Sequence, residues 1–307
     1  MSRFFAACLC AAFALLSTAH ADSRKPIRMG GLFSNDVFTY APQYDRWRTG
    51  SGVFSLARAS EWNGELPTRM GELLEFRLGA ELISPDRIAS RRDNRDRPYA
   101  EKLSLGVHTH FQRREVEFSF GLDLVVTGEQ TGLETFQGAI HDVLGLKGAS
   151  ASNKAARVGN GIHPTLTFEI GREFAISEQL RYRPFVEVQG GVETLVRVGG
   201  DLYLGRVGSD ALLVRESSTG HRYAVNRGQE KGWGAVLGAD IAYVAHSVLL
   251  PETRLSQLTD TRSRVRAGMR WHGEKMQVFY GLSWLGKEFT RQRDEQVVGS
   301  LNISFQF

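Results

Sequence analysis

Apolar and polar residues alternate with a period of two in many segments of the chain. In LLEFRLGAEL, the apolar positions from Leu74 to Leu82 share one face, and the positions from Glu75 to Glu81 share the other. The same alternation recurs in EVEFSFGLDLVV, RVRAGMRW and KMQVFYGLSW. A period of two predicts β-strands whose two faces meet different surroundings.

The alternating segments predict an all-β chain of about twelve strands, an even number as bacterial membrane barrels require. Each segment is about ten residues long, which is the length a tilted strand needs to cross a bilayer. The stretch Gly208–Glu230 stays open between a long turn and an extra hairpin. The predicted strands are Ile27–Ser34, Gly52–Ala59, Leu73–Ile83, Leu103–Phe111, Val116–Val126, Leu166–Arg172, Tyr182–Val192, Leu195–Val207, Gly232–Ala245, Arg264–Trp271, Met276–Leu285 and Val297–Phe307.

Two further features favour a transmembrane antiparallel β-barrel over a periplasmic β-sandwich. The polar faces of the strands carry many charges, which suits a wet barrel lumen better than a solvent face between tight hairpins. The chain ends in GSLNISFQF, an alternating segment that closes on Phe307. Such an ending is similar to the terminal strand of bacterial outer-membrane barrels. We therefore expect a multi-pass barrel in the outer membrane.

The N-terminal residues predict secretion. A charged start and a short apolar stretch end in an A-x-A cleavage pattern, so residues 1–21 form a signal peptide and residues 22–307 form the barrel. Both cysteines, Cys8 and Cys10, lie in the removed segment, which excludes disulfides and thiol chemistry from the mature chain. The net charge of +4 comes from basic residues interleaved with acids, so we expect no nucleic-acid partner.

The strand count places three polar segments at one rim of the barrel. They are SNDVFTYAPQYDRWRTGSG after the first strand, SPDRIASRRDNRDRPYA after the third and TGLETFQGAIHDVLG after the fifth. If the N-terminus is periplasmic, loops after odd-numbered strands are extracellular and should be the longer ones. Short turns at Gln112–Glu115, Ala175–Gln179 and His272–Lys275 fit the other rim. The three polar segments should therefore meet on the external rim.

The segment TGLETFQGAIHDVLG predicts a short external helical element in an otherwise all-β chain. Gln137 and His141 stand four residues apart, a spacing that puts two side chains on one face of a helix. In the functional interpretation, Gln137 anchors the helix to the rim and His141 points at a substrate. The alternative is a lid on which His141 is only a solvated residue.

These segments, taken in order, resemble the lipid A 3'-O-deacylase family of outer-membrane barrels. The resemblance rests on Asn35-Asp36, on the residues from Asp45 to Thr49, on Asp96-Arg97-Pro98-Tyr99-Ala100, on Gln137-x-x-x-His141 and on the final Phe. It implies a twelve-stranded barrel whose active site lies between the wall and a small external helical element. It also implies calcium-dependent hydrolysis of an ester of lipid A, which releases the 3' acyloxyacyl chain.

The resemblance assigns catalytic roles to four residues. His141 matches the catalytic histidine, Asn35 and Asp36 match the Asn-Asp pair, and Thr49 is the best match for a hydroxyl residue, with Ser51 as the alternative. A neutral histidine is a natural base near pH 7. Asp36 and nearby carbonyl groups would bind Ca²⁺, a hard cation that polarises an ester carbonyl.

One position departs from the family pattern. The family usually has a glutamate six residues after the histidine, and here that residue is Lys147, followed by GASASNKAARVGNG. Glu134 and Asp142 are candidates to supply the missing carboxylate. The departure predicts altered substrate use or lost activity as alternatives to the full reaction.

An arginine-rich loop after the third strand predicts contact with an anionic lipid. Guanidinium groups match phosphates well, so Arg91, Arg92 and Arg95 are candidate ligands of lipid A phosphates in lipopolysaccharide. The alternative is a solvated charge run. We expect the barrel to act as a monomer. Two rival functions remain, a passive barrel (a porin or an inactive relative) and an outer-membrane phospholipase, although the sequence offers no Ser–His pair of the kind that phospholipase uses.

Overall fold

The computed structural model describes residues 27–39, 46–59, 62–90, 93–144, 148–226, 228–253 and 257–305. For residues 140, 141, 143, 144 and 305 it describes the backbone alone. The predicted signal peptide, residues 1–21, and the terminal Phe307 lie outside the described residues. Among the residues it does describe, no helix is long and apolar enough to cross a membrane.

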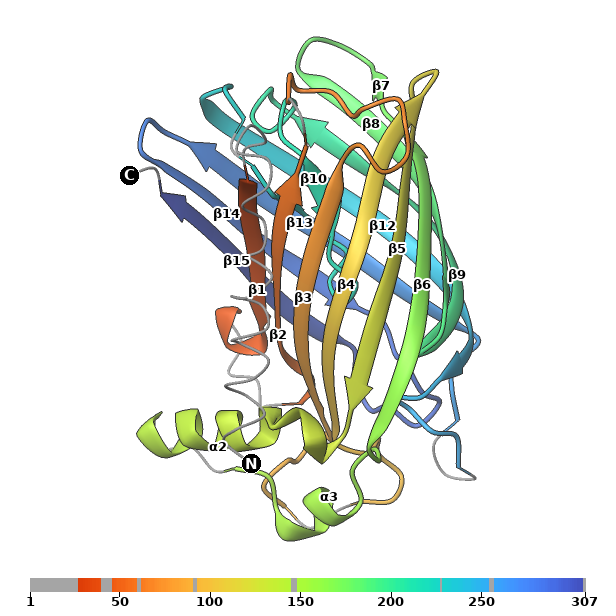
Figure 1. Cartoon of the computed structure of the whole chain (residues 1–307). Helices are drawn as coiled ribbons and strands as arrows, with labels where there is room; N and C mark the ends of the chain where they lie inside the picture. Colours follow the sequence, from red (N-terminus) through yellow and green to blue (C-terminus); the bar gives the residue numbers. More distant parts are fainter. Residues whose placement is uncertain are drawn as a thin grey trace.

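Twelve long antiparallel strands close into a barrel (Figure 1), which confirms the predicted fold class. They are β1 (Ile27–Asn35), β2 (Trp47–Arg58), β3 (Leu74–Ser84), β4 (Ala100–Arg113), β5 (Val116–Thr127), β6 (Gly161–Arg172), β8 (Leu180–Gly190), β9 (Glu193–Leu204), β12 (Gly232–Ser247), β13 (Thr261–His272), β14 (Met276–Leu285) and β15 (Gln296–Phe305). Each pairs with its neighbours in chain order, and β15 pairs with β1 to close the barrel. The two-residue β7 (Phe174–Ala175) pairs with β8.

The strands turn their apolar faces outward and their charged faces inward. On β3, Phe76 and Leu78 are 44% and 45% exposed, whereas Glu75 and Glu81 are 0% and 3% exposed. The exposed apolar band continues around the barrel and includes Met29, Phe54, Leu105, Leu122, Leu166, Val198, Leu237, Met269 and Ile303. An apolar outer band around a polar lumen is the arrangement of a barrel that is solvated by lipid.

A hairpin inside the barrel resolves the stretch that the sequence left open. It consists of β10 (Leu213–Arg215), β11 (Arg222–Ala224) and the turn between them, and we call residues 213–224 the lumen hairpin. Its backbone packs directly on β1, because a Cβ added at Gly30 would lie 2.1 Å from the carbonyl oxygen of Ala224. Only glycine at this position of β1 admits the hairpin without a shift of one backbone or the other.

The lumen hairpin bonds to strands on several sides of the wall. The Arg215 guanidinium pairs with Glu169 of β6 at 2.7 Å and with Asp201 of β9 at 3.0 Å. The hydroxyl of Tyr223 lies 2.6 Å from Ser55 of β2. A barrel of about eight strands is filled by its own side chains, whereas roughly 16 to 18 strands leave an open channel. Twelve strands fall between these cases, and here the inserted hairpin occupies part of the lumen.

The two ends of the barrel differ. The end formed by the loops after β1, β3 and β5 carries η1 (Asp36–Phe38), η2 (Glu129–Thr131), α2 (Leu133–Leu144) and α3 (Ala151–Ala155), and we call it the α2 rim; it is the lower end in Figure 1. The opposite rim has tight connections such as Arg114–Glu115, where both residues take positive φ angles of 48° and 65°. The predicted helix over Gln137 and His141 is confirmed as α2, while α3 had no counterpart in the sequence analysis.

Candidate functional site

The Asn35-Asp36 pair lies where β1 ends at the α2 rim. Asn35 is the N-cap of η1, and its Oδ1 accepts a hydrogen bond from the backbone amide of Val37 at 2.8 Å. Asp36 is fully buried, and its Oδ2 accepts from the backbone amide of Arg46 at 3.4 Å. The cap turns the chain sharply after Asn35, so that a carboxylate is buried at the very edge of the barrel.

Thr49 lies beside this pair on β2. The strand register pairs Asn35 with Gly50, the residue next to Thr49. Between β2 and β3 the register shifts from Arg48 to Gly50, so Thr49 occupies a β-bulge and is 2% exposed. Bulges re-aim side chains and are frequent near functional sites. The structure thus brings the segments of Asn35, Asp36 and Thr49 together, as the sequence analysis predicted. The alternative, Ser51, lies two residues further into the strand.

Helix α2 is held against the same rim by two residues of the β3–β4 loop and β4. Gln137 Oε1 accepts a hydrogen bond from the hydroxyl of Tyr99 at 2.8 Å, which confirms that Gln137 anchors the helix. Glu101 Oε2 accepts from the hydroxyl of Thr131 at 2.8 Å and from the backbone amide of Glu134 at 3.1 Å. A carboxylate at the first turn satisfies an amide that the helix cannot pair internally, and its charge suits the positive end of the helix dipole.

His141 stands one turn after Gln137 on α2, and its side chain lies outside the described part of the molecule. Lys147 lies outside it as well. Of the two candidate carboxylates near them, Glu134 forms an ion pair with Lys154 at 2.5 Å, and Asp142 is exposed on α2. The sequence pattern contains Tyr99 but gives it no role, and it does not point to Glu101. The sequence signal that could have pointed to them is their position: Tyr99 lies within the Asp96–Ala100 motif, and Glu101 follows it directly.

A buried cluster of charged residues inside the barrel connects three segments of the α2 rim: the β14–β15 loop, the β3–β4 loop and the start of β2. The carboxylate of Glu288, in the β14–β15 loop, pairs with Arg97 and lies 2.8 Å from Nε of Arg48. Burial opposes the charge of Glu288, but the nearby guanidinium groups of Arg48, Arg97 and Arg262 outweigh it and hold the pKa of Glu288 well below its usual value. Glu288 therefore stays charged, and it links the residue before Thr49 to the loop that carries Tyr99.

The arginine-rich loop is only partly within the described residues. Arg91 and Arg92 lie outside them, and Arg95 is exposed with its backbone amide bonded to Asp93 at 2.9 Å. Asp96 shapes this loop by accepting from the backbone amides of Asp86 at 2.5 Å and Arg97 at 2.8 Å. Burial raises the pKa of Asp96. The guanidinium of Arg97, by contrast, turns into the barrel to Glu288.

Candidate metal ligands at the rim are all oxygen atoms. Within the described ranges, no group of three or more His, Cys, Asp or Glu side chains could hold a metal ion. The rim does offer the carboxylate of Asp36, the hydroxyl of Thr49 and nearby backbone carbonyl groups. Such a set, with one carboxylate and several neutral oxygens, fits the preference of Ca²⁺.

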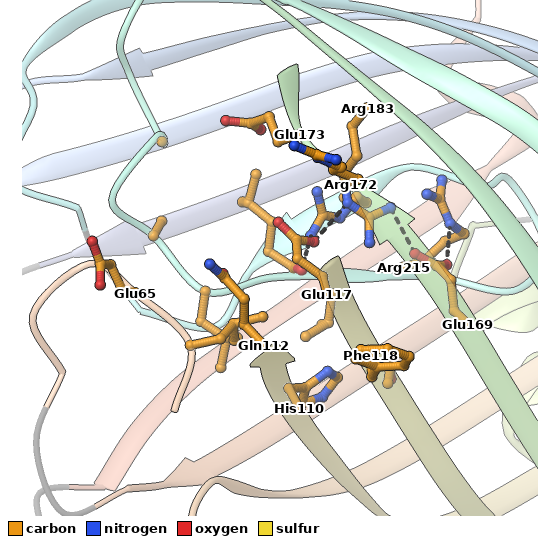
Figure 2. A pocket seen from close by; sticks show the side chains of 18 of the residues that line it. Glu65, His110, Gln112, Glu117, Phe118, Glu169, Arg172, Glu173, Arg183 and Arg215 are labelled. Carbon is orange, nitrogen blue, oxygen red and sulfur yellow. Dashed lines mark hydrogen bonds and ion pairs between the residues drawn. The ribbon is translucent and has the colours of Figure 1, made fainter. Parts of the chain in front are cut away.

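A cavity of about 510 Å³ lies elsewhere, in the lumen near the opposite rim. Figure 2 shows that several of its charged side chains, among them Glu117, Glu169, Arg183 and Arg215, gather on one side of the cavity. Arg183 pairs with Glu117 at 2.7 Å and with Glu169 at 2.8 Å, and Arg215 pairs with Glu169. These four charges are thus satisfied by one another within the barrel. The candidate site is therefore the α2 rim.

A closed twelve-stranded barrel with a lipid-facing band and a polar, hairpin-filled lumen is an outer-membrane β-barrel. The family model described as "Outer membrane protein LpxR" matches residues 4–307. The chain belongs to this family.

Comparison with solved structures agrees with the family. The structure of LpxR from Salmonella typhimurium superposes with a TM-score of 0.75 and 17% sequence identity, covering 92% of this chain and 100% of that one. A KdgM porin, with a TM-score of 0.40 and 5% identity, covers 92% of this chain and 99% of that one. The β domain of the Bordetella autotransporter BrkA, with a TM-score of 0.42 and 11% identity, covers 93% and 100%. The last two similarities are too weak to bear on function. No curated protein sequence matches the chain.

Proposed function

We propose that the chain is a calcium-dependent hydrolase of the outer membrane that removes the 3'-linked acyloxyacyl chain from lipid A. The observation that carries the proposal is the meeting of separate motifs on one rim. Asn35, Asp36 and Thr49 lie together at the ends of β1 and β2, and α2 is docked on the same rim through Gln137. A hydrolase that acts on lipid in the outer leaflet needs its site at the external edge of the wall, so we propose that the α2 rim faces the cell exterior.

In this proposal, His141 is the general base. Its imidazole takes a proton from the attacking water, and it later gives that proton to the sugar alkoxide that leaves, so that acid and alcohol are released. Ester cleavage needs no Ser or Cys nucleophile when water is activated in this way. A short helix anchored by Gln137 and Glu101 would hold the base more rigidly than a free loop.

Asp36 would bind Ca²⁺ together with neighbouring oxygens, and the bound ion would polarise the ester carbonyl. Asn35 would orient the substrate. Its Oδ1 is committed to the Val37 amide, so Nδ2 is the atom that can donate to an ester oxygen. Gly50 opposite leaves room for this amide, because a Cβ there would lie 3.2 Å from Nδ2. The hydroxyl of Thr49 can serve as a second donor.

The lumen hairpin argues against the main rival, a passive channel. It crosses the interior and bonds to β2, β6 and β9, so it obstructs the space that a porin keeps open for solutes. The inner charges, which alone would suit a porin lumen, are largely paired with one another. A lipid hydrolase does not need an open lumen, because its substrate reaches the site from the membrane.

Two substitutions test the proposal. His141→Ala should lower the rate of deacylation by about 10²–10⁴-fold, the usual loss for a general base, and leave barrel assembly intact. Asp36→Ala should lower activity in a way that added calcium partly restores. Purified variants in detergent, with lipid A products measured by mass spectrometry, separate the two effects. Equal activity of wild type and His141→Ala would end the proposed mechanism.

A further inference from the structure

The first residues of β2 extend beyond the end of β1. The β1–β2 ladder stops where Asn35 pairs with Gly50, but β2 begins three residues earlier, at Trp47. On its other side this segment still pairs with β3, Trp47 with Ser84. Buried backbone amides and carbonyls require partners, so the edge of the segment that faces β15 needs a substitute for the missing strand.

Gln296, the first residue of β15, supplies that substitute with its side chain. It is 2% exposed. Its Nε2 donates to the carbonyl oxygens of Arg46 at 2.7 Å and Arg48 at 3.3 Å, and its Oε1 accepts from the amide of Arg48 at 3.0 Å. A primary amide both donates and accepts in one plane, as a peptide group does. Gln296 therefore replaces a short piece of strand between β2 and β15.

The segment that Gln296 holds is strained. Trp47 has a φ of 53°, in the left-handed region that bulky residues avoid, and the bulge at Thr49 follows at once. Conformations of this kind persist only where the surroundings fix them, and they cluster at functional sites. The same segment reaches the second site residue, because the Arg46 amide donates to Asp36.

We propose that Gln296 is a positioning residue for the hydrolase, acting through the Arg46–Arg48 backbone to set the places of Thr49 and Asp36. The inference rests on the proposed function of this rim. Gln296 is buried and serves the backbone, so its loss should lower kcat and leave KM close to the wild-type value. A misplacement of about 1 Å in a catalytic group lowers rate by up to about 10²-fold, so we expect a decrease of roughly 10- to 100-fold.

The test uses two variants and a matched control. Gln296→Glu keeps the shape but cannot donate to the two carbonyl oxygens, and Gln296→Met removes the polar group without adding a charge, in case the first variant fails to assemble. The control is Gln277→Met, which changes an equally buried glutamine of β14 near the opposite rim. Lipid A cleavage gives kcat and KM for each protein in detergent.

A spectroscopic measurement on the same proteins reports the segment without relying on activity. The chain has five tryptophans, so 5-fluorotryptophan labelling gives five ¹⁹F resonances, and Trp47→Phe identifies that of Trp47. The inference predicts that both Gln296 variants shift this resonance and lower kcat, while the control does neither. It is overturned if the resonance stays in place, or if it shifts while kcat does not change. If the wild type cleaves no lipid A, the proposed function fails, and the Trp47 resonance alone decides whether Gln296 holds the segment.

Discussion

Replacing Glu101 with glutamine should loosen α2 from the barrel. Glu101 is fully buried, and its carboxylate accepts from Thr131, from the Glu134 amide and from Arg157 at 3.3 Å. Glu101→Gln keeps the shape and one carbonyl oxygen but removes the charge. Hydrogen bonds to a charged group contribute about 1.5–3 kcal/mol. Loss of one such contribution lowers the ratio of docked to undocked helix by roughly 10- to 150-fold.

Hydrogen exchange measures this ratio directly. Backbone amides of α2 exchange through the undocked state, so their exchange in detergent should accelerate by the same factor in Glu101→Gln. The control is Glu129→Gln, which removes a carboxylate that pairs with the same Arg157 at 3.0 Å but is 62% exposed. Exposed pairs contribute about 0–1 kcal/mol, so this variant should exchange nearly as the wild type does. Equal exchange in both variants would refute the reasoning, because burial of the carboxylate would then make no difference.

Three other predictions concern the lumen, the substrate and the departure from the family pattern. In planar bilayers the purified barrel should give no steady channel, because the lumen hairpin obstructs the passage; stepwise conductance would contradict this. Replacing Arg91, Arg92 and Arg95 together with alanine should reduce cleavage of phosphorylated lipid A more than of lipid A without phosphates, and equal losses would assign the loop a structural role. Lys147→Glu should raise activity by restoring the carboxylate that the family pattern has at this position, and an unchanged rate would remove Lys147 from the site.

The strands could be predicted because lipid and lumen impose opposite demands on alternate residues. Every one of the twelve predicted strands has its counterpart, and errors concentrate at the α2 rim. There β2 begins at Trp47 instead of Gly52, and β6 at Gly161 instead of Leu166. Apart from Trp47 and Ile162, the residues of these strand ends are polar, small or proline, so the period of two is not visible although the backbone remains paired.

The lumen hairpin could not be predicted with the same rule. Its strands are three residues long, and Leu213, Val214 and Arg215 are all buried, so no alternation marks them. Gly30 is a sequence signal of the inserted hairpin, because the hairpin backbone packs against it. A glycine within a strand is, however, equally typical of a bulge or a bend. The ion-pair partners of the inward-facing charges could not be predicted either. Arg215 and Glu169 are 46 residues apart in the sequence, and only the folded barrel brings them into contact.

The location of the candidate site could be predicted from the sequence, but the residues that hold the site in place could not. The order of strands alone put Asn35, Asp36 and α2 on one rim. The residues that hold them, Glu101 and Gln296, are single polar residues at strand ends, and only the folded geometry shows what they contact.

The central claim is tested most directly by lipid A itself. Expression of the full chain in a Gram-negative host of known lipid A, followed by mass spectrometry of lipid A from membranes incubated with calcium or with a chelator, measures the proposed reaction. The account predicts a new species lighter by the 3' acyloxyacyl chain, formed with calcium, lost with the chelator and absent with His141→Ala. An unchanged lipid A spectrum from cells that carry the assembled wild-type barrel in the outer membrane would contradict it.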